Sequence, residues 1–294
     1  MKINVKVSVI SIIIIIISGI AALIGLFSRN IHNFSAVTSS YGEKIELYQI
    51  GLYARDSVSM ASQAIAQDFI TLVIGIPLLI VGLYLINIKK IVHGWFLLTG
   101  TLGYFLYTYT SYAILMTFND LYLLYVFLLI LSFYGFIMSL FYLSKYNKEL
   151  IFSSNYPTKS LSFFFLISGF AICIMWLGRI IPVIGKEIAP YGLEQYSTLA
   201  IQTLDLGFIV PASFVTAWLL YSKEKWGYLL SAVLVMKMIT MVAAVSVMGI
   251  NMKLHGVKMN VSDLMVFPII LIISIIFIIK ILRTINKVEL DNLK

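Results

Sequence analysis

The chain has 294 residues, of which 61 % are hydrophobic and only 12 % are charged. A soluble domain carries about 25 % charged residues, so this composition excludes an ordinary soluble protein and predicts a polytopic membrane protein. The net charge of +8 does not indicate nucleic-acid binding, because no basic patch interleaves with aromatic residues in a soluble segment. Cys173 is the single cysteine, which excludes an intrachain disulfide and argues against a membrane thiol oxidoreductase.

Apolar windows of about 20 residues predict eight transmembrane helices. They cover residues 7–27, 66–88, 92–116, 121–144, 160–182, 200–222, 226–249 and 263–283. The apolar run of the first helix exceeds the roughly 7–15 residues of a signal peptide, so we expect it to remain in the protein. Most lysines and arginines then fall on the side of both termini. The positive-inside rule therefore predicts a multi-pass protein of the cell (plasma) membrane with both termini in the cytoplasm.

We expect residues 1–294 to form a single membrane domain of the all-α class, with no appended soluble domain. The longest segment outside the predicted helices, residues 28–65, is expected to lie on the outer interface. Within it, Asp56 and Ser57 are expected to cap a helix that continues into the second span.

The two halves of the sequence share an order of short motifs. Residues 17–21 (ISGIA) recur as residues 167–171 (ISGFA), and an aspartate followed by a proline occurs in the second and sixth spans. An aromatic residue beside a glycine opens the third and seventh spans, and an Asp-Leu pair opens the fourth and eighth. The shared order predicts a tandem duplication, with repeat one at residues 1–149 and repeat two at residues 160–294. Four helices per repeat make the repeats parallel, related by an axis along the membrane normal.

Lys237 is the leading candidate functional residue. It lies in the apolar run 226–250 with about 18 Å of helix on either side, too deep for a lysine to reach a membrane face. A charge at that depth costs about 2.5–3.5 kcal/mol even on the most forgiving scale. Asp205 lies more than one turn inside the sixth span, and Asp68 lies inside a helix if that helix begins near Ser57. We expect these charged residues to form a polar site between the repeats.

Helical spacing adds further candidates for this binding or charge-coupling site. They share faces with the charged residues or line the third helix: Gln202, Thr240, Tyr104 and Thr108. Tyr104 corresponds to Lys237 if the glycines that open the third and seventh spans are equivalent. The alternative is that small and hydroxyl residues only mediate helix packing in lipid.

Asp205 is the expected partner of Lys237, although helical rise separates the two by about 10 Å in depth. A water-bridged pair, a tyrosine partner and a neutral lysine are equally compatible with the sequence. Arg179 is a second candidate partner for the aspartates, or an interface anchor beside Trp176. Asp120 and Asp263 are expected to act as helix caps.

Motifs of metal, phosphate and hydrolase chemistry are missing from the sequence, among them His-Glu-x-x-His, Gly-x-Ser-x-Gly and Gly-x-x-x-x-Gly-Lys. We therefore expect no metal, no cofactor and no catalytic residue, and we favour a protein that is not an enzyme. The leading hypothesis is a small-solute or ion-coupled transporter with its polar site in the outer half of the membrane. The alternatives are a non-catalytic sensor or assembly subunit, and a membrane-embedded enzyme acting on a lipid or isoprenoid. The expected partners are the lipid bilayer and a small-molecule or ion ligand, and the oligomeric state stays open.

Overall fold

The computed structural model describes the backbone of residues 3–258 and 261–286 and the side chains of residues 4–258 and 267–286. The long helical stretches are α1 (Ile3–Phe27), α2 (Val58–Ile70), η2 (Thr71–Gly75), α3 (Ile76–Asn87), α4 (Val92–Leu115), α5 (Tyr122–Leu143), α7 (Thr158–Ile180), α8 (Ala200–Leu204), η4 (Asp205–Ile209), α9 (Val210–Tyr221), α10 (Lys225–Leu254) and α11 (Val261–Thr284). The short elements are β1 (Val37–Thr38), β2 (Lys44–Ile45), η1 (Gly51–Tyr53), α6 (Lys148–Ile151) and η3 (Ile181–Val183).

Seven helical stretches are long and apolar enough to cross a membrane. They are Asn4–Phe27, Val58–Asn87, Tyr122–Leu143, Thr158–Val183, Ala200–Tyr221, Lys225–Leu254 and Phe267–Thr284. The fold is therefore a helical bundle of the multi-pass membrane class. The small antiparallel pair of β1 and β2, with Val37 opposite Ile45, lies outside these stretches.

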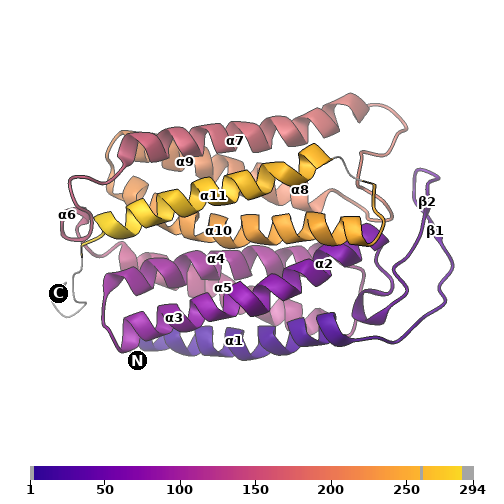
Figure 1. Ribbon diagram of the computed structural model, residues 1–294, viewed down its shortest axis with the longest axis horizontal. Helices are drawn as coiled ribbons and strands as arrows, with labels where there is room; N and C mark the ends of the chain where they lie inside the picture. The colour runs from indigo at the N-terminus through magenta and orange to yellow at the C-terminus, as the bar shows by residue number, and fades with distance from the viewer. Residues whose placement is uncertain (1–2, 259–260, 287–294) are drawn as a thin grey trace.

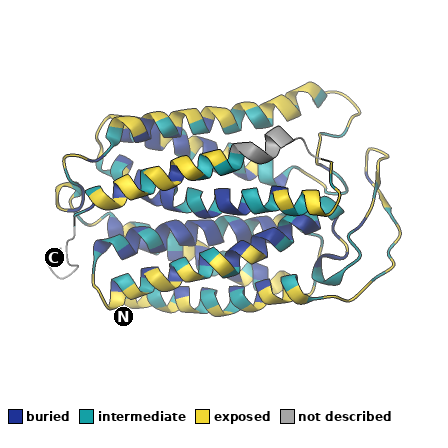
Figure 2. Cartoon of the chain, in the orientation of Figure 1, coloured by how far each residue is buried: buried dark blue, intermediate teal, exposed yellow. Residues whose placement is uncertain are grey.

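The remaining long helix, α4, has 24 residues but is not among the seven, because glycines, hydroxyls and tyrosines lower its hydropathy. Most of its residues are buried, and it packs against α3, α5 and α10. It is largely dark blue in Figure 2, whereas α7 and α11 carry much exposed surface. A helix surrounded by other helices needs few lipid-facing side chains, which explains its polar composition.

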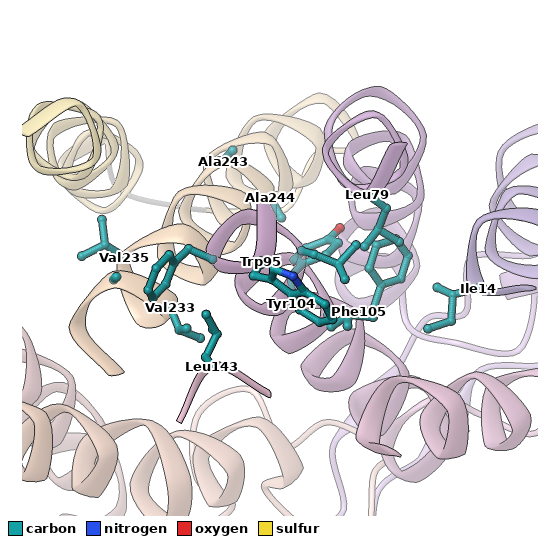
Figure 3. Packing of buried hydrophobic residues seen from close by; sticks show 14 of the residues in the cluster. Ile14, Leu79, Trp95, Tyr104, Phe105, Leu143, Val233, Val235, Ala243 and Ala244 are labelled. Atoms are coloured by element: carbon teal, nitrogen blue, oxygen red, sulfur yellow. The ribbon is translucent and has the colours of Figure 1, made fainter. Parts of the chain in front are cut away.

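The helices lie side by side, with the loops gathered at their two ends (Figure 1). One end, which we call the loop end, carries residues 28–57, 116–121 and 181–199. At the opposite end α1 begins and α11 finishes. Buried aromatic and aliphatic side chains of α4 fill the centre of the bundle, including Trp95, Tyr104 and Phe105 (Figure 3). Close packing of this kind holds helices together where lipid removes the hydrophobic driving force between them.

The helix predicted over 66–88 begins earlier, at Val58. Ser57 is its N-cap, and its side-chain oxygen accepts a hydrogen bond from the Met60 N–H at 3.0 Å. This confirms the predicted cap and shortens the predicted loop 28–65 to residues 28–57. The sequence between 58 and 65 is too polar for a hydropathy window to include it.

Two helical stretches contain a π-helical turn, η2 and η4, each followed by a proline at the start of the next α-helix. The Ile76 N–H bonds to the Thr71 carbonyl, and the Val210 N–H bonds to the Asp205 carbonyl, each five residues back. The wider turn makes room for the proline, which has no N–H to donate to the preceding turn of the helix. The offset is 134 residues both between the two π-helical turns and between Pro77 and Pro211.

Two glycines allow close approach at neighbouring helix hairpins. A Cβ atom at Gly94 would lie 2.9 Å from the backbone nitrogen of Ile86, where α4 folds back on α3. A Cβ at Gly227 would collide with the backbone nitrogen of Leu220, where α10 folds back on α9. In both hairpins, therefore, a glycine near the start of the second helix packs against the backbone of the first helix.

Candidate functional site

Lys237 lies where α10 crosses α4. Its ammonium nitrogen is 4.4 Å from the centroid of the Tyr107 ring, on α4. Gly100 and Gly103 bring the two helices together here: a Cβ at Gly103 would lie 3.6 Å from Lys237 Cγ. Within the described part of the chain, Lys237 has no side-chain hydrogen bond and no carboxylate within ion-pair distance. The ring of Tyr107 is therefore its direct contact, and Asp205 is the charge that acts on it over a longer distance.

Asp205 is the first residue of η4, and two aromatic side chains hold its carboxylate. The Tyr107 hydroxyl donates to Oδ1 at 2.8 Å, and the Trp176 indole N–H donates to Oδ2 at 2.8 Å. Lys237 thus connects to Asp205 through Tyr107, whose ring faces the cation and whose hydroxyl binds the anion. Of the arrangements that the sequence left open, this is the tyrosine partner and not the direct pair.

Asp68 lies apart from Lys237, between α2, α4 and η1. The Tyr53 hydroxyl donates to Oδ2 at 2.6 Å, and the Tyr112 hydroxyl lies 3.0 Å from Oδ1 and 2.9 Å from the Ala64 carbonyl oxygen. Gly25 of α1 covers this carboxylate, since a Cβ at Gly25 would collide with Asp68 Oδ2. Asp68 is buried, with a relative exposure of 3 %. It binds phenols of its own half of the chain and does not join the Lys237 cluster.

Tyr104 belongs to a third polar group, which links α2 and η2 to α4. The Gln67 amide donates to the Tyr104 hydroxyl at 2.8 Å and to Thr108 Oγ1 at 2.7 Å, and Thr71 Oγ1 lies 3.0 Å from the same phenol. The side-chain amide oxygen of Gln67, Oε1, is buried and has no hydrogen-bond partner among the described residues. The predicted single site is therefore three neighbouring clusters, joined through the face of α4.

The other predicted site residues lie outside these clusters. Gln202 lines a cavity at the loop end. The Thr240 hydroxyl donates to the Lys237 carbonyl of its own helix at 2.8 Å. The Arg179 guanidinium lies over the Trp176 ring, 5.1 Å from its centroid, and over a second aromatic ring, as an anchor would. None of the three side chains makes a hydrogen bond to Asp205, and only the backbone carbonyl of Gln202 accepts the Asp205 N–H within their shared helix.

Asp120, which we expected to cap α5, does not do so in the structure. Asp120 is exposed, and the N-cap of α5 is Leu121, which makes no side-chain cap hydrogen bond. The Asn119 side-chain oxygen accepts the Leu121 N–H at 3.0 Å instead. Asp263 falls in α11, but its side chain lies outside the described residues.

Sequence reasoning did not single out Tyr107, Trp176 and Gln67. Tyr107 lies seven residues after Gly100 and four after Gly103, which places it on the face of α4 that meets α10. That spacing is a usable signal, but α4 carries several tyrosines with similar spacing. Trp176 was treated as an interface residue, and its bond to Asp205 depends on how α7 packs against η4.

Acidic residues also join the loops at the loop end. Asp56 Oδ1 accepts the Thr117 N–H and the Tyr196 hydroxyl, both at 2.9 Å. The Ser57 hydroxyl donates to Glu194 Oε2. Loops from both halves of the chain therefore meet at these two carboxylates.

Burial governs the pKa values of both acids. It raises the pKa of Asp56 from 3.8 to about 6, although the hydrogen bonds from Thr117 and Tyr196 lower it. The pKa of Glu194 is also raised, first by burial and then by the nearby charges of Glu43 and Asp56. Among the described residues no lysine or arginine forms a salt bridge with either acid, so burial favours the protonated form of both.

Two adjoining cavities open beside Glu194. One has a volume of about 350 Å³ and the other about 370 Å³, and both are lined by Tyr41, Leu193 and Ser197. Gln202, Thr203 and Leu206, which flank Asp205 in the sequence, line the first cavity. Neither cavity is lined by Lys237 or Asp205 themselves.

Comparison with known proteins adds no family: no protein-family model, no curated protein and no solved structure matches the chain. The structure defines the class as a multi-pass helical membrane protein with charged side chains inside the bundle. No group of three metal-ligating side chains lies within the described residues.

Proposed function

We propose that this protein is a small-solute or ion-coupled membrane transporter whose coupling site is the cluster Lys237–Tyr107–Asp205. The observation that carries the proposal is Lys237 itself, a lysine far from both ends of a membrane-spanning helix with a tyrosine ring in place of a counter-ion. Ionisable side chains inside a membrane bundle are costly and mark substrate or ion pathways by default. A cation that can exchange its partner is what coupling requires.

The flanking backbone supports movement at this site. Asp205 begins the π-helical turn η4, so its carboxylate lies where the helix departs from the regular α-helical pattern. π-helical turns recur at functional sites, and transporters place binding groups at interrupted helices near mid-membrane. If the helical stretch bent at η4, the distance between Asp205 and Tyr107 would change.

The proposal includes the two parallel repeats and an eighth spanning helix, α4. An offset of 133 residues relates Gly94 to Gly227, which close equivalent hairpins. The same offset relates Gly100 to Val233, and these two residues touch where α4 meets α10. In a two-fold arrangement, equivalent positions meet at the axis. Lys237 would then occupy the position of Tyr104, beside that axis.

This alignment changes the pairing of the acidic residues. With the offset of 134 residues shared by the π-helical turns, Asp205 corresponds to Thr71, and Asp68 corresponds to Gln202. In this alignment the two aspartates stand one helical turn apart, whereas the sequence motifs pair them with each other. Divergence of this kind would leave repeat one as the rigid half and repeat two as the half that binds.

Transport is tested by charge movement in reconstituted proteoliposomes on a solid-supported membrane. The assay would present amino acids, sugars, amines, carboxylates and inorganic cations in turn. We expect at least one to produce a current that Lys237→Met abolishes and Lys253→Met retains, since Lys253 is an exposed lysine of the same helix. An equal current from the Lys237→Met protein would contradict the proposal.

The second candidate function is a non-catalytic sensor or assembly subunit. The observation in its favour is that neither loop-end cavity reaches Lys237 or Asp205. In that case ligand binding would shift the loop end without any flux through the bundle. Ligand binding in the absence of any solute-dependent current would favour this candidate over transport.

Membrane orientation belongs to the same proposal: the loop end outside and both termini in the cytoplasm of a plasma-membrane protein. The chain offers a clean test, because Cys173 is its one cysteine. In a Cys173→Ser background, Ser40→Cys should react with a membrane-impermeant maleimide on intact cells and Lys145→Cys should not. Labelling of Lys145→Cys but not of Ser40→Cys would show that the protein has the opposite orientation.

A further inference from the structure

We propose that the two cavities at the loop end form one entry site for a small organic ammonium ion, held by the Glu194 carboxylate and the rings of Tyr41 and Tyr196. The inference deepens the proposed function by naming its substrate class, and it rests on that function only for what happens after binding. The binding step stands on the lining of the cavities and is measurable by itself.

The size and continuity of the cavities suit a small organic molecule. Their volumes of about 350 and 370 Å³ fall in the range of small-molecule pockets, roughly 300–1,000 Å³. Tyr41, Leu193 and Ser197 line both, so a ligand that enters one lies against the wall of the other. The site is therefore wider than an inorganic ion needs.

The charge of the lining selects a cation. Glu194 lines the second cavity, and Glu43 and Asp56 lie close enough to raise its pKa further. No lysine or arginine lines either cavity in the described part of the chain. An anionic solute would meet only repulsion here, whereas an ammonium ion would relieve the cost of the buried carboxylate.

The aromatic lining favours an organic ammonium over a metal ion. Tyr41 and Tyr196 line the cavity with Glu194, and aromatic side chains beside a carboxylate suit an alkylated amine. One oxygen of Glu194 is taken by the Ser57 hydroxyl, so a single carboxylate oxygen remains for the ligand. One free carboxylate oxygen among the hydroxyls of Ser40 and Ser197 is a weak site for a hard cation such as Ca²⁺, which takes about 6–8 oxygen ligands.

The interior cluster already holds an ammonium group in the same way. The Lys237 nitrogen lies 4.4 Å from the centroid of the Tyr107 ring, and the hydroxyl of that ring binds Asp205. Gln202 and Leu206, which line the first cavity, belong to the same helical stretch as Asp205. An ammonium solute that moved inward would meet a second carboxylate with aromatic neighbours, and Lys237 would be its tethered competitor.

The test is isothermal titration of the purified full-length protein with choline and with its uncharged carbon isostere, dimethylbutanol. We expect choline to bind and the isostere to bind at least about tenfold more weakly, because a charge-assisted contact is lost. Equal binding of the two, or no choline binding at millimolar concentration, would overturn the inference.

Glu194→Gln removes the charge and keeps an oxygen that can accept the Ser57 hydroxyl. We expect it to weaken choline binding about tenfold, and we expect Glu187→Gln, an exposed acid of the same loop, to leave binding unchanged. Tyr41→Leu gives an independent readout if Glu194→Gln fails to fold, since Tyr41 is 48 % exposed. It should weaken choline binding about threefold through the lost ring face. Unchanged choline affinity in Glu194→Gln would overturn the inference, and so would unchanged affinity in Tyr41→Leu if Glu194→Gln does not fold.

Lys237→Met separates this inference from the proposed function. Because Lys237 lines neither cavity, the variant should still show the choline binding that Glu194→Gln weakens, while losing solute-dependent current. Choline binding without any current would contradict transport and leave the entry site standing. A current with some other solute, without choline binding, would contradict the entry site and leave transport standing.

Discussion

Gly100 of α4 meets Val233 of α10 so closely that a Cβ atom at position 100 would lie 2.8 Å from the Val233 carbonyl oxygen. The same Cβ would collide with the side chain of Met236 and lie 3.1 Å from the backbone nitrogen of Lys237. This contact sets the distance between the central helix and the helix that carries Lys237. The stability of the bundle and the geometry at Lys237 therefore depend on one missing methyl group.

We expect Gly100→Ala to destabilise the protein by about 1–3 kcal/mol, because the neighbouring atoms are two backbone atoms and the Met236 Cβ, which cannot move aside unless α10 itself moves. Thermal unfolding in detergent measures the loss. Gly178→Ala is the matched control, since Gly178 lies in α7 with nothing within 4 Å of its added Cβ. It should be neutral or slightly stabilising, because alanine favours a helix over glycine. Equal unfolding temperatures for both variants would show that α4 and α10 can separate freely.

Tyr53 and Tyr112 should each contribute to stability through Asp68. Replacing either by phenylalanine leaves one buried carboxylate oxygen without its donor, which costs about 1–3 kcal/mol. Tyr134→Phe is the control, because Tyr134 is 58 % exposed on α5. The unfolding temperature should fall for Tyr53→Phe and Tyr112→Phe and stay constant for the control. Equal unfolding temperatures for all three variants would show that the two hydroxyls do not stabilise the protein through Asp68.

The extent of the helices was predictable from the sequence, and the contacts between them were not. The apolar run 121–144 anticipated α5 (Tyr122–Leu143) to within a residue, because the bilayer fixes the length of a spanning helix. The N-cap Ser57 was also recognisable, since capping is a local interaction. By contrast, helical rise gave the depth of Lys237 and Asp205 but not their rotation about neighbouring helices.

Rotation decides which side chain stands between the two charges. Tyr107 faces Lys237 because Gly100 and Gly103 admit α10 on that side of α4, a packing fact that no single helix encodes. The separation of Asp68 from the cluster has the same origin, since Gly25 of α1 and η1 close over it. Glycine positions were visible in the sequence, but their partner helices were not.

Lys237→Met should stabilise the protein while abolishing its function. The substitution removes a charge whose burial costs about 2.5–3.5 kcal/mol and gives up one ring contact worth about 0.5–2 kcal/mol. We expect a gain of about 1–3 kcal/mol in thermal or denaturant unfolding. Lys253→Met, at an exposed position of the same helix, should change stability by less than about 0.5 kcal/mol. A large loss of stability in Lys237→Met would instead identify a structural lysine.

Stability at the loop end should fall as the pH rises through the pKa of Asp56. Burial raises this pKa from 3.8 to about 6, so the folded loops bind a proton more tightly than the unfolded chain does. The resulting stabilisation is fully present below pH 3.8 and is lost as the pH rises to about 6 and above. The two pKa units correspond to as much as about 3 kcal/mol.

Asp56→Asn isolates this effect, because its side-chain oxygen can still accept the Thr117 and Tyr196 donors while carrying no charge. We expect the variant to match the native protein near pH 4 and to exceed it in stability near pH 7.5, measured by thermal unfolding and by amide exchange in residues 45–60. Glu194 keeps a dependence of the same sign in both proteins, but a weaker one in the variant, because the Asp56 charge no longer raises its pKa. The difference between the two proteins therefore reports the Asp56 charge together with its effect on Glu194. Asp120→Asn, at an exposed aspartate, should leave the pH profile unchanged. A native protein that gains stability over Asp56→Asn as the pH rises would mean that an uncharacterised cation compensates the Asp56 carboxylate.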